Sequence, residues 1–213
     1  LASLQYLRAG NNRLTGNIPS SIYTLPNLLY LSLGNNLLSG EIGSGINSLT
    51  KLQQLDLSGN QLTGGIPASI GSIGTLRSLY LNGNRLTGSI PGELGSIWNL
   101  QELALHENQL SGELPTALAG AQNLYYLSLY SNQLQGSLPA WLGSMYSLDT
   151  LYLSDNNFSG QIPANLGYSN YLYFLGLSGN QLEGAIPATF ANLSYLRGLW
   201  ASGNLLSGEL PGF

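Results

Sequence analysis

The sequence repeats with a period of 24 residues, and no insertion or deletion interrupts the period. Nine units begin at leucines in matching positions: Leu4, Leu28, Leu52, Leu76, Leu100, Leu124, Leu148, Leu172 and Leu196. Residues 4–195 make eight full units, and residues 196–213 begin a ninth. A fixed period of this length predicts a solenoid, in which each unit packs only on its neighbours. We therefore expect residues 1–213 to form a single elongated domain.

The first part of each unit predicts a β-strand with one buried face. Counted from the leading leucine, position 4 is Leu in all nine units, and position 6 is Leu in seven. Ala9 and Ala201 take position 6 in the outermost units. These apolar positions alternate with polar or variable residues at positions 3, 5 and 7, which is the period of a half-buried strand. Stacked units align such strands into a parallel sheet.

Position 9 is asparagine in every unit: Asn12, Asn36, Asn60, Asn84, Asn108, Asn132, Asn156, Asn180 and Asn204. After the strand the chain has to leave the sheet and turn inside the stack, where backbone amides and carbonyls lose contact with water. An inward asparagine carries two donors and one acceptor that can satisfy those groups. We therefore predict a structural asparagine ladder along the solenoid.

The second half of each unit predicts turns on the opposite face. Position 13 is Gly in all nine units, and position 16 is Pro in eight, with Gly43 as the exception. Glycine permits unusual backbone angles, while proline fixes φ and removes a donor. We expect a helical turn at positions 17 to 22, with apolar residues at positions 11, 15, 19 and 22 closing the core.

Composition narrows the classes of function. Charged residues make up only 8% of the chain and the formal net charge is −4, so nucleic acid is an unsuitable partner. Without a basic cluster or an apolar run of about 20 residues, we expect no membrane contact by this segment. The chain has no cysteine and one histidine, which argues against disulfides, cysteine-ligated metals and metal sites with several histidines.

We predict no enzymatic activity and no cofactor. His106 is the only histidine, and its expected neighbours across the sheet, Asn82 and Tyr130, are not nucleophiles. No glycine-rich phosphate-binding motif occurs. His106 with Glu102 and Glu107 can attract a cation or a basic peptide group, but we interpret these residues as solvated surface groups.

Three segments identify a family. Leu14–Pro19 (LTGNIP), Leu86–Pro91 (LTGSIP) and Leu110–Pro115 (LSGELP) resemble the plant-specific class of leucine-rich repeats. The resemblance implies an α/β solenoid, a right-handed twisted horseshoe with a parallel β-sheet on the concave face. It also implies 3₁₀ turns and short extra strands on the convex side, and an extracellular or cell-surface location.

The sequence departs from this family in two respects. The paired cysteines that usually occur in terminal caps are absent, and so is the non-repeat insertion that some hormone receptors use as a pocket. Both ends fall inside a unit and lack the polar caps that solenoids need. We therefore expect the ends to be truncated, with the domain forming part of a longer protein.

Aromatic residues gather on the predicted open face in the last four units. These residues occupy positions 3, 5 and 7: Tyr126, Tyr130, Tyr152, Phe174 and Trp200. Strand spacing places Tyr130, Tyr152 and Phe174 on one diagonal, which Trp200 continues as a bend and beside whose start Tyr126 lies. We predict that this band is the main contact surface for a peptide, protein or glycan. The alternative interpretation is that tyrosines simply cover the sheet.

Two segments fit the N-glycosylation pattern, Asn157-Phe158-Ser159 and Asn192-Leu193-Ser194. Because the family resemblance implies secretion, we predict glycans on Asn157 and Asn192. Asn157 follows an asparagine of the ladder and should be exposed, whereas Asn192 should lie on a convex or flanking turn.

Three functions remain open. The first is an extracellular recognition module, similar to a receptor ectodomain, that binds its ligand on the concave face. The second is a structural or self-associating protein of the matrix, an adhesin or a filament, whose partner is itself. The third is an ice- or polysaccharide-binding surface made from the Ser/Thr row at position 12, which Gln135 and Glu183 interrupt.

Overall fold

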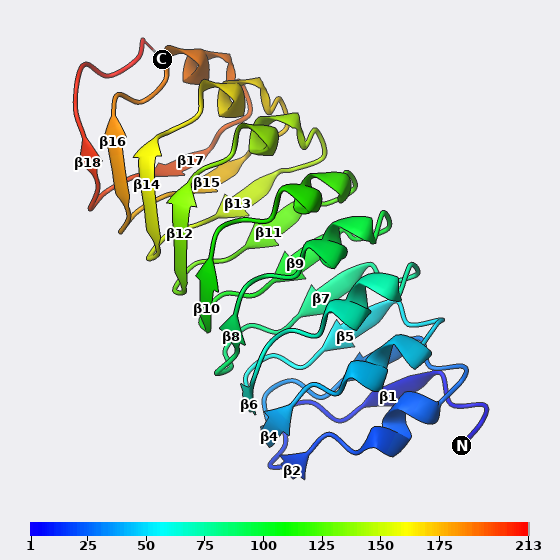
Figure 1. The fold of residues 1–213 in the computed structure, drawn as a ribbon. Coiled ribbons are helices and arrows are strands. Elements are labelled where there is room, and N and C mark those ends of the chain that lie inside the picture. Colours follow the sequence, from blue (N-terminus) through cyan, green and yellow to red (C-terminus); the bar gives the residue numbers. More distant parts are fainter. Residues whose placement is uncertain (213) are drawn as a thin grey trace.

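In the computed structural model, which describes residues 1–212, the repeats form coils that stack in sequence order into a twisted array (Figure 1). Each complete coil contains a strand of the main sheet, a second short strand and a 3₁₀ helix on the far side. The predicted repeat solenoid, with its parallel sheet on one face and 3₁₀ turns on the other, is confirmed. No helix in this part of the chain has the length and apolar character that crossing a membrane requires.

The concave face is a nine-stranded parallel sheet in sequence order. Its strands are β1 Tyr6–Arg8, β3 Tyr30–Ser32, β5 Gln54–Asp56, β7 Ser78–Tyr80, β9 Glu102–Ala104, β11 Tyr126–Ser128, β13 Thr150–Tyr152, β15 Phe174–Gly176 and β17 Gly198–Trp200. The register advances by one repeat at each step, so that Leu79 pairs with Leu103. The central leucine of a strand points into the core, and Leu103 is fully buried. Positions 3 and 5 therefore face away from the core.

A second set of short parallel strands contributes one strand per coil, which follows the turn at the end of the strand in the main sheet. It comprises β2 Thr15–Asn17, β4 Leu37–Glu41, β6 Gln61–Thr63, β8 Thr87–Gly88, β10 Gln109–Gly112, β12 Gln133–Ser137, β14 Asn157–Gln161, β16 Gln181–Gly184 and β18 Leu205–Leu206. The set divides into a three-stranded and a six-stranded sheet between β6 and β8, where an isolated bridge joins Gly65 to Thr87.

The convex side carries the 3₁₀ helices. They are η1 Ser20–Thr24, η2 Ser44–Ser48, η3 Ala68–Ser72, η4 Gly92–Ser96, η5 Thr116–Gly120, η6 Ala140–Ser144, η7 Ala164–Tyr168 and η8 Ala188–Asn192. A proline precedes each of them except η2, which follows Gly43. A Cβ at Gly43 would lie 2.8 Å from Cε2 of Tyr23, and the Gly43 amide donates to the Tyr23 hydroxyl at 3.1 Å. Glycine therefore replaces proline where the preceding coil has a buried tyrosine.

The asparagines of position 9 join neighbouring coils through their side-chain amides. Asn108 Nδ2 donates to the carbonyl oxygens of Leu81 and Leu105, both at 3.0 Å. Asn108 Oδ1 accepts from the Leu86 amide at 3.0 Å. The same pattern recurs along the stack, whereas the side chain of Asn12, in the first coil, is exposed and bonds only to carbonyls of its own turn.

Candidate binding surface

Four aromatic rings of the last four units form a connected network, here called the aromatic platform: Tyr126, Tyr152, Phe174 and Trp200. They stand on the neighbouring strands β11, β13, β15 and β17. The ring centroids of Tyr126 and Tyr152 are 6.4 Å apart in an edge-to-face arrangement. The Trp200 indole lies 6.2 Å from the Tyr152 ring and stacks on Phe174 at 6.1 Å. The four side chains thus make one surface that crosses the strands.

Glycines leave the space into which two of these rings lean. From β11 to β17, the aromatic residue alternates between position 3 and position 5 from one strand to the next. On each of these strands a smaller residue occupies whichever of the two positions the aromatic residue does not. A Cβ on Gly176 would lie 2.9 Å from Cδ1 of Tyr152, and a Cβ on Gly198 would overlap the Trp200 indole. The rings therefore lie across the sheet instead of standing upright on it.

Two polar residues complete this alternation beneath the rings. Ser128 pairs with Tyr152 in the sheet and is 0% exposed, although it belongs to the concave face. Thr150 lies between Tyr126 and Phe174 and is only 8% exposed. Large and small residues thus alternate in both directions, and the platform shields the backbone below it.

Tyr130 packs elsewhere. Its ring stacks on His106, with centroids 4.3 Å apart and planes inclined by 15°. The predicted band therefore divides. His106 occupies the same unit position as Tyr130 on the neighbouring strand, whereas Tyr152 is also displaced along the strand and so lies farther from Tyr130. Tyr126, which sequence spacing placed beside the band, joins the platform instead of Tyr130.

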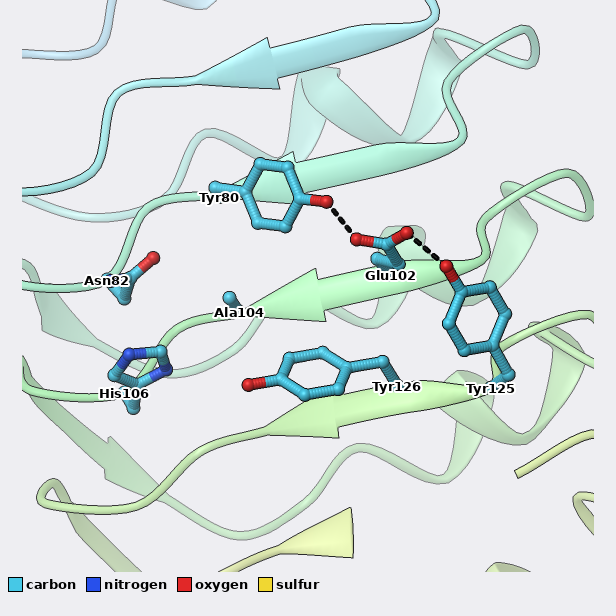
Figure 2. Close-up of a pocket in the computed structure, with 7 residues that line it drawn as sticks. All are labelled: Tyr80, Asn82, Glu102, Ala104, His106, Tyr125 and Tyr126. Atoms are coloured by element: carbon cyan, nitrogen blue, oxygen red, sulfur yellow. Dashed lines mark hydrogen bonds between the residues drawn. The ribbon is translucent and has the colours of Figure 1, made fainter. Parts of the chain in front are cut away.

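A hollow of about 290 Å³ adjoins the platform at Tyr126 (Figure 2). We call it the concave hollow, and its lining residues are Tyr80, Asn82, Glu102, Ala104, His106, Tyr125 and Tyr126. Ala104 is small and 3% exposed where β7, β13 and β17 carry an aromatic residue at the same position. The small side chain of Ala104 therefore leaves open space between the rings of Tyr80 and Tyr126, which also line the hollow.

Two tyrosine hydroxyls fix the carboxylate of Glu102. The Tyr80 hydroxyl donates to Oε2, and the Tyr125 hydroxyl donates to Oε1 (Figure 2). The hydrogen bond to Glu102, together with burial and nearby negative charge, raises the pKa of Tyr125 to about 12. The phenol of Tyr125 therefore remains a hydrogen-bond donor across the physiological pH range.

His106 is partly buried, which corrects the interpretation of this residue as a solvated surface group. Its Nδ1 lies 3.0 Å from the hydroxyl oxygen of Ser128. Burial lowers the pKa of His106, and the neighbouring Glu107 carboxylate opposes this effect. Glu107 itself adopts a left-handed φ of 56° in the turn after β9 and does not line the hollow. A neutral imidazole is therefore the expected form at neutral pH.

Tyr125 is the site residue that sequence reasoning missed. It occupies position 2, just before β11, whereas the alternation of a half-buried strand predicts exposed side chains only at positions 3, 5 and 7. Its ring reaches back by one coil to Glu102. The sequence does contain a signal for this contact, because the aromatic residue at position 2 is preceded, one unit earlier, by an acidic residue at position 3.

The two predicted glycosylation sites lie on the surface. Asn157 is exposed at the beginning of β14, and Asn192 is exposed at the end of η8. Within residues 1–212, no three histidine, aspartate or glutamate side chains are grouped closely enough to hold a metal ion.

The repeats match a known family. The family model described as Leucine rich repeat matches residues 2–62 and 98–158, and a second model of that description matches residues 75–97 and 171–193. The chain belongs to the leucine-rich-repeat family, and its repeats are of the plant, receptor-like type. No curated protein matches this sequence with significant similarity.

Solved structures show the same fold. The plant peptide hormone receptor RGFR1 in complex with RGF2 is 36% identical with a TM-score of 0.96, over 99% of this chain and 34% of that chain. The Arabidopsis receptor kinase HAESA, in complex with the peptide hormone IDA and the co-receptor SERK1, is 39% identical with a TM-score of 0.94, over 97% of this chain and 35% of that chain. A plant ice-binding protein is 31% identical with a TM-score of 0.86, over 100% of this chain and 68% of that chain. This chain spans about a third of the length of the receptors.

Proposed function

We propose that this domain is an extracellular recognition module that binds a peptide or a peptide segment of a protein on its concave face. The observation that carries the proposal is the aromatic platform, in which three ring–ring contacts connect four rings. Tyrosine and tryptophan offer a large, rigid contact area at a low cost in side-chain entropy. Such a surface favours binding because its side chains are already ordered.

Similar proteins support a peptide as the ligand. RGFR1 and HAESA share more than a third of their matched residues with this chain. RGFR1 is described as a plant peptide hormone receptor in complex with RGF2, and HAESA as a receptor kinase in complex with the peptide hormone IDA. The platform crosses several strands, so an extended peptide that follows it lies across the sheet and meets several coils. Recognition of this kind requires binding only, and we propose no catalytic role.

The same similarity and the two exposed sequons support an extracellular location. We expect native protein, secreted from a eukaryotic cell, to carry glycans on Asn157 and Asn192. Intact-mass measurement before and after enzymatic deglycosylation checks this, with Asn157→Gln and Asn192→Gln each removing one glycan. An unchanged mass after deglycosylation contradicts the assignment.

The binding proposal is tested by selection from a display library of random short peptides. Wild-type domain is the target, and the double variant Tyr152→Ser with Trp200→Ser is used for counter-selection. We expect peptides that bind wild type and lose affinity for the double variant. Peptides that bind both proteins equally exclude the platform as the contact surface.

A matched control removes the same residue types elsewhere. Trp98 and Tyr146 are 65% and 63% exposed in the turns that join η4 to β9 and η6 to β13. The double variant Trp98→Ser with Tyr146→Ser should retain peptide binding. Sedimentation of the wild-type domain at increasing concentration addresses the alternative, since a self-associating structural protein forms larger species and a recognition module remains monomeric.

A second candidate function is ice binding, which the similarity to a plant ice-binding protein favours. The exposed Thr63 and Thr87 belong to a Ser/Thr row on the second set of strands. That row is broken where β6 and β8 separate and at Gln135 and Glu183, so it offers a less regular surface than the platform. Thermal hysteresis of the purified domain tests this candidate, and we expect none.

A further inference from the structure

We propose that the concave hollow binds a basic side chain, arginine or lysine, of the peptide ligand, with the Glu102 carboxylate as its counter-charge. The identity of the partner as a peptide rests on the proposed function. The affinity of the hollow for a cationic group rests on its own residues and is tested separately.

Glu102 is oriented for a second set of interactions. Its two oxygens each accept one phenol hydroxyl, from Tyr80 and from Tyr125. A carboxylate has about four lone-pair sites, so each oxygen retains one for a further donor. Among the described residues, none that lines the hollow is a lysine or an arginine. A guanidinium or ammonium group from a ligand therefore supplies both the missing donor and the missing positive charge.

The walls of the hollow favour a cation. The rings of Tyr80, Tyr125 and Tyr126 line the hollow together with Glu102, and aromatic faces attract guanidinium and ammonium groups. Figure 2 shows the hydroxyl of Tyr126 pointing toward His106, with Ala104 beside them in the hollow. Since burial lowers the pKa of His106, its ring is neutral near pH 7 and does not repel a cation.

The size of the hollow suits one side chain. Its volume of about 290 Å³ falls at the lower limit of roughly 300–1,000 Å³ that is typical of pockets for whole small-molecule ligands. The platform adjoins it through Tyr126, which belongs to both. A ligand that places one basic side chain in the hollow can therefore extend its neighbouring residues over the rings.

The strand spacing fixes the distance between the two parts of such a ligand. Glu102 on β9 and Phe174 on β15 are three strands apart, which corresponds to about 14 Å. An extended peptide covers that distance in about four residues. Peptides selected against the domain should therefore carry a basic residue about four positions from an apolar or aromatic residue.

The charge requirement is tested with two small probes by NMR titration of the isotope-labelled domain. The probes are Nα-acetyl-arginine amide and its neutral isostere Nα-acetyl-citrulline amide. We expect the arginine probe to shift the amide signals of Glu102, Ala104 and His106, and the citrulline probe to leave them in place. Equal shifts with both probes overturn the proposal.

Variants then locate the site. Glu102→Gln keeps the shape but removes the charge and should weaken binding of the arginine probe about tenfold or more, as for the loss of a hydrogen bond to a charged group. The matched control Glu113→Gln, at an exposed residue beyond β10, should bind as wild type does. An unchanged affinity in Glu102→Gln contradicts the proposal.

A second variant keeps the carboxylate and fills the hollow. Ala104→Tyr places at position 5 a residue that Tyr80 and Tyr152 already show to be compatible with the sheet. It should abolish binding of the arginine probe, and retained binding overturns the assignment even if Glu102→Gln fails to fold. If the arginine probe binds but no selected peptide depends on the platform, only the proposed function is refuted. If selected peptides depend on the platform but the arginine probe does not bind, only the proposal for the hollow is refuted.

Discussion

The indole of Trp200 stacks on the ring of Phe174, with centroids 6.1 Å apart and planes inclined by 28°. The two residues stand on adjacent strands at different unit positions, and they meet because the indole leans across Gly198. Tyr152 contacts the indole from a third strand. The arrangement therefore depends on a residue without a side chain as much as on the rings themselves.

Filling the space beneath the indole should disturb the platform. We predict that Gly198→Val displaces Trp200 and lowers the affinity for selected peptides about two- to tenfold, the worth of one aromatic pair. Isothermal titration calorimetry measures the change. The control Gln54→Val, at the same unit position on β5, should bind normally. Normal binding by Gly198→Val shows that the lean of the indole is irrelevant to recognition.

The asparagine ladder should be strong inside the stack and weak at its first coil. Asn108→Ala removes amide donors to two carbonyls of different coils and leaves the Leu86 amide without its acceptor. We predict a loss of about 1–3 kcal/mol in the free energy of unfolding, measured by urea denaturation. Asn12→Ala, which breaks only bonds within an exposed turn, should cost clearly less. Equal losses for both variants contradict this account.

The pKa of His106 should lie below its ordinary value of 6.5, because burial disfavours the charged ring. NMR titration of its ring protons measures this. A depressed pKa means that the unfolded chain binds the proton more readily. The contribution of His106 to stability is therefore complete above about pH 6.5 and is lost as pH falls through the folded-state pKa. Glu107→Gln should lower the pKa further, and a pKa above 6.5 in wild type contradicts the burial argument.

Tyr125 provides the opposite case, with a pKa raised to about 12 chiefly by its hydrogen bond to Glu102. Its stabilising contribution is present below the ordinary value of 10.0 and is lost as pH rises from there through the folded-state value. Glu102→Gln should return the pKa of Tyr125 toward 10.0. Site-specific ¹³C labelling of the tyrosine ring makes the titration visible, and an unaltered pKa in that variant means that the hydrogen bond is not its cause.

Much of the fold could be predicted from the sequence because it depends on repetition. A leucine at position 4 and an asparagine at position 9 in every unit are compatible with only one stacking register, which the pairing of Leu79 with Leu103 shows. The exception at Gly43 is explained by its contact with Tyr23 of the preceding coil, which becomes apparent only when the two coils are stacked on each other.

The site was less predictable because it depends on how side chains lean. The spacing along and between strands predicts that Tyr130 and Phe174 are equally near to Tyr152. The ring of Tyr130 nevertheless stacks on His106. The glycines and Ala104 decide where rings can lie and where a hollow remains, and small residues give little signal in a sequence. Tyr125 enters the site from outside the strand, which a strict two-residue alternation does not consider.

The affinity of a selected peptide for three proteins, measured by isothermal titration calorimetry, tests the role of the platform most directly. The proteins are wild type, Tyr152→Ser with Trp200→Ser, and the matched control Trp98→Ser with Tyr146→Ser. The platform account predicts that the first double variant loses at least about tenfold in affinity while the control binds as wild type does. Equal affinity for all three proteins, with the fold intact by circular dichroism, contradicts it.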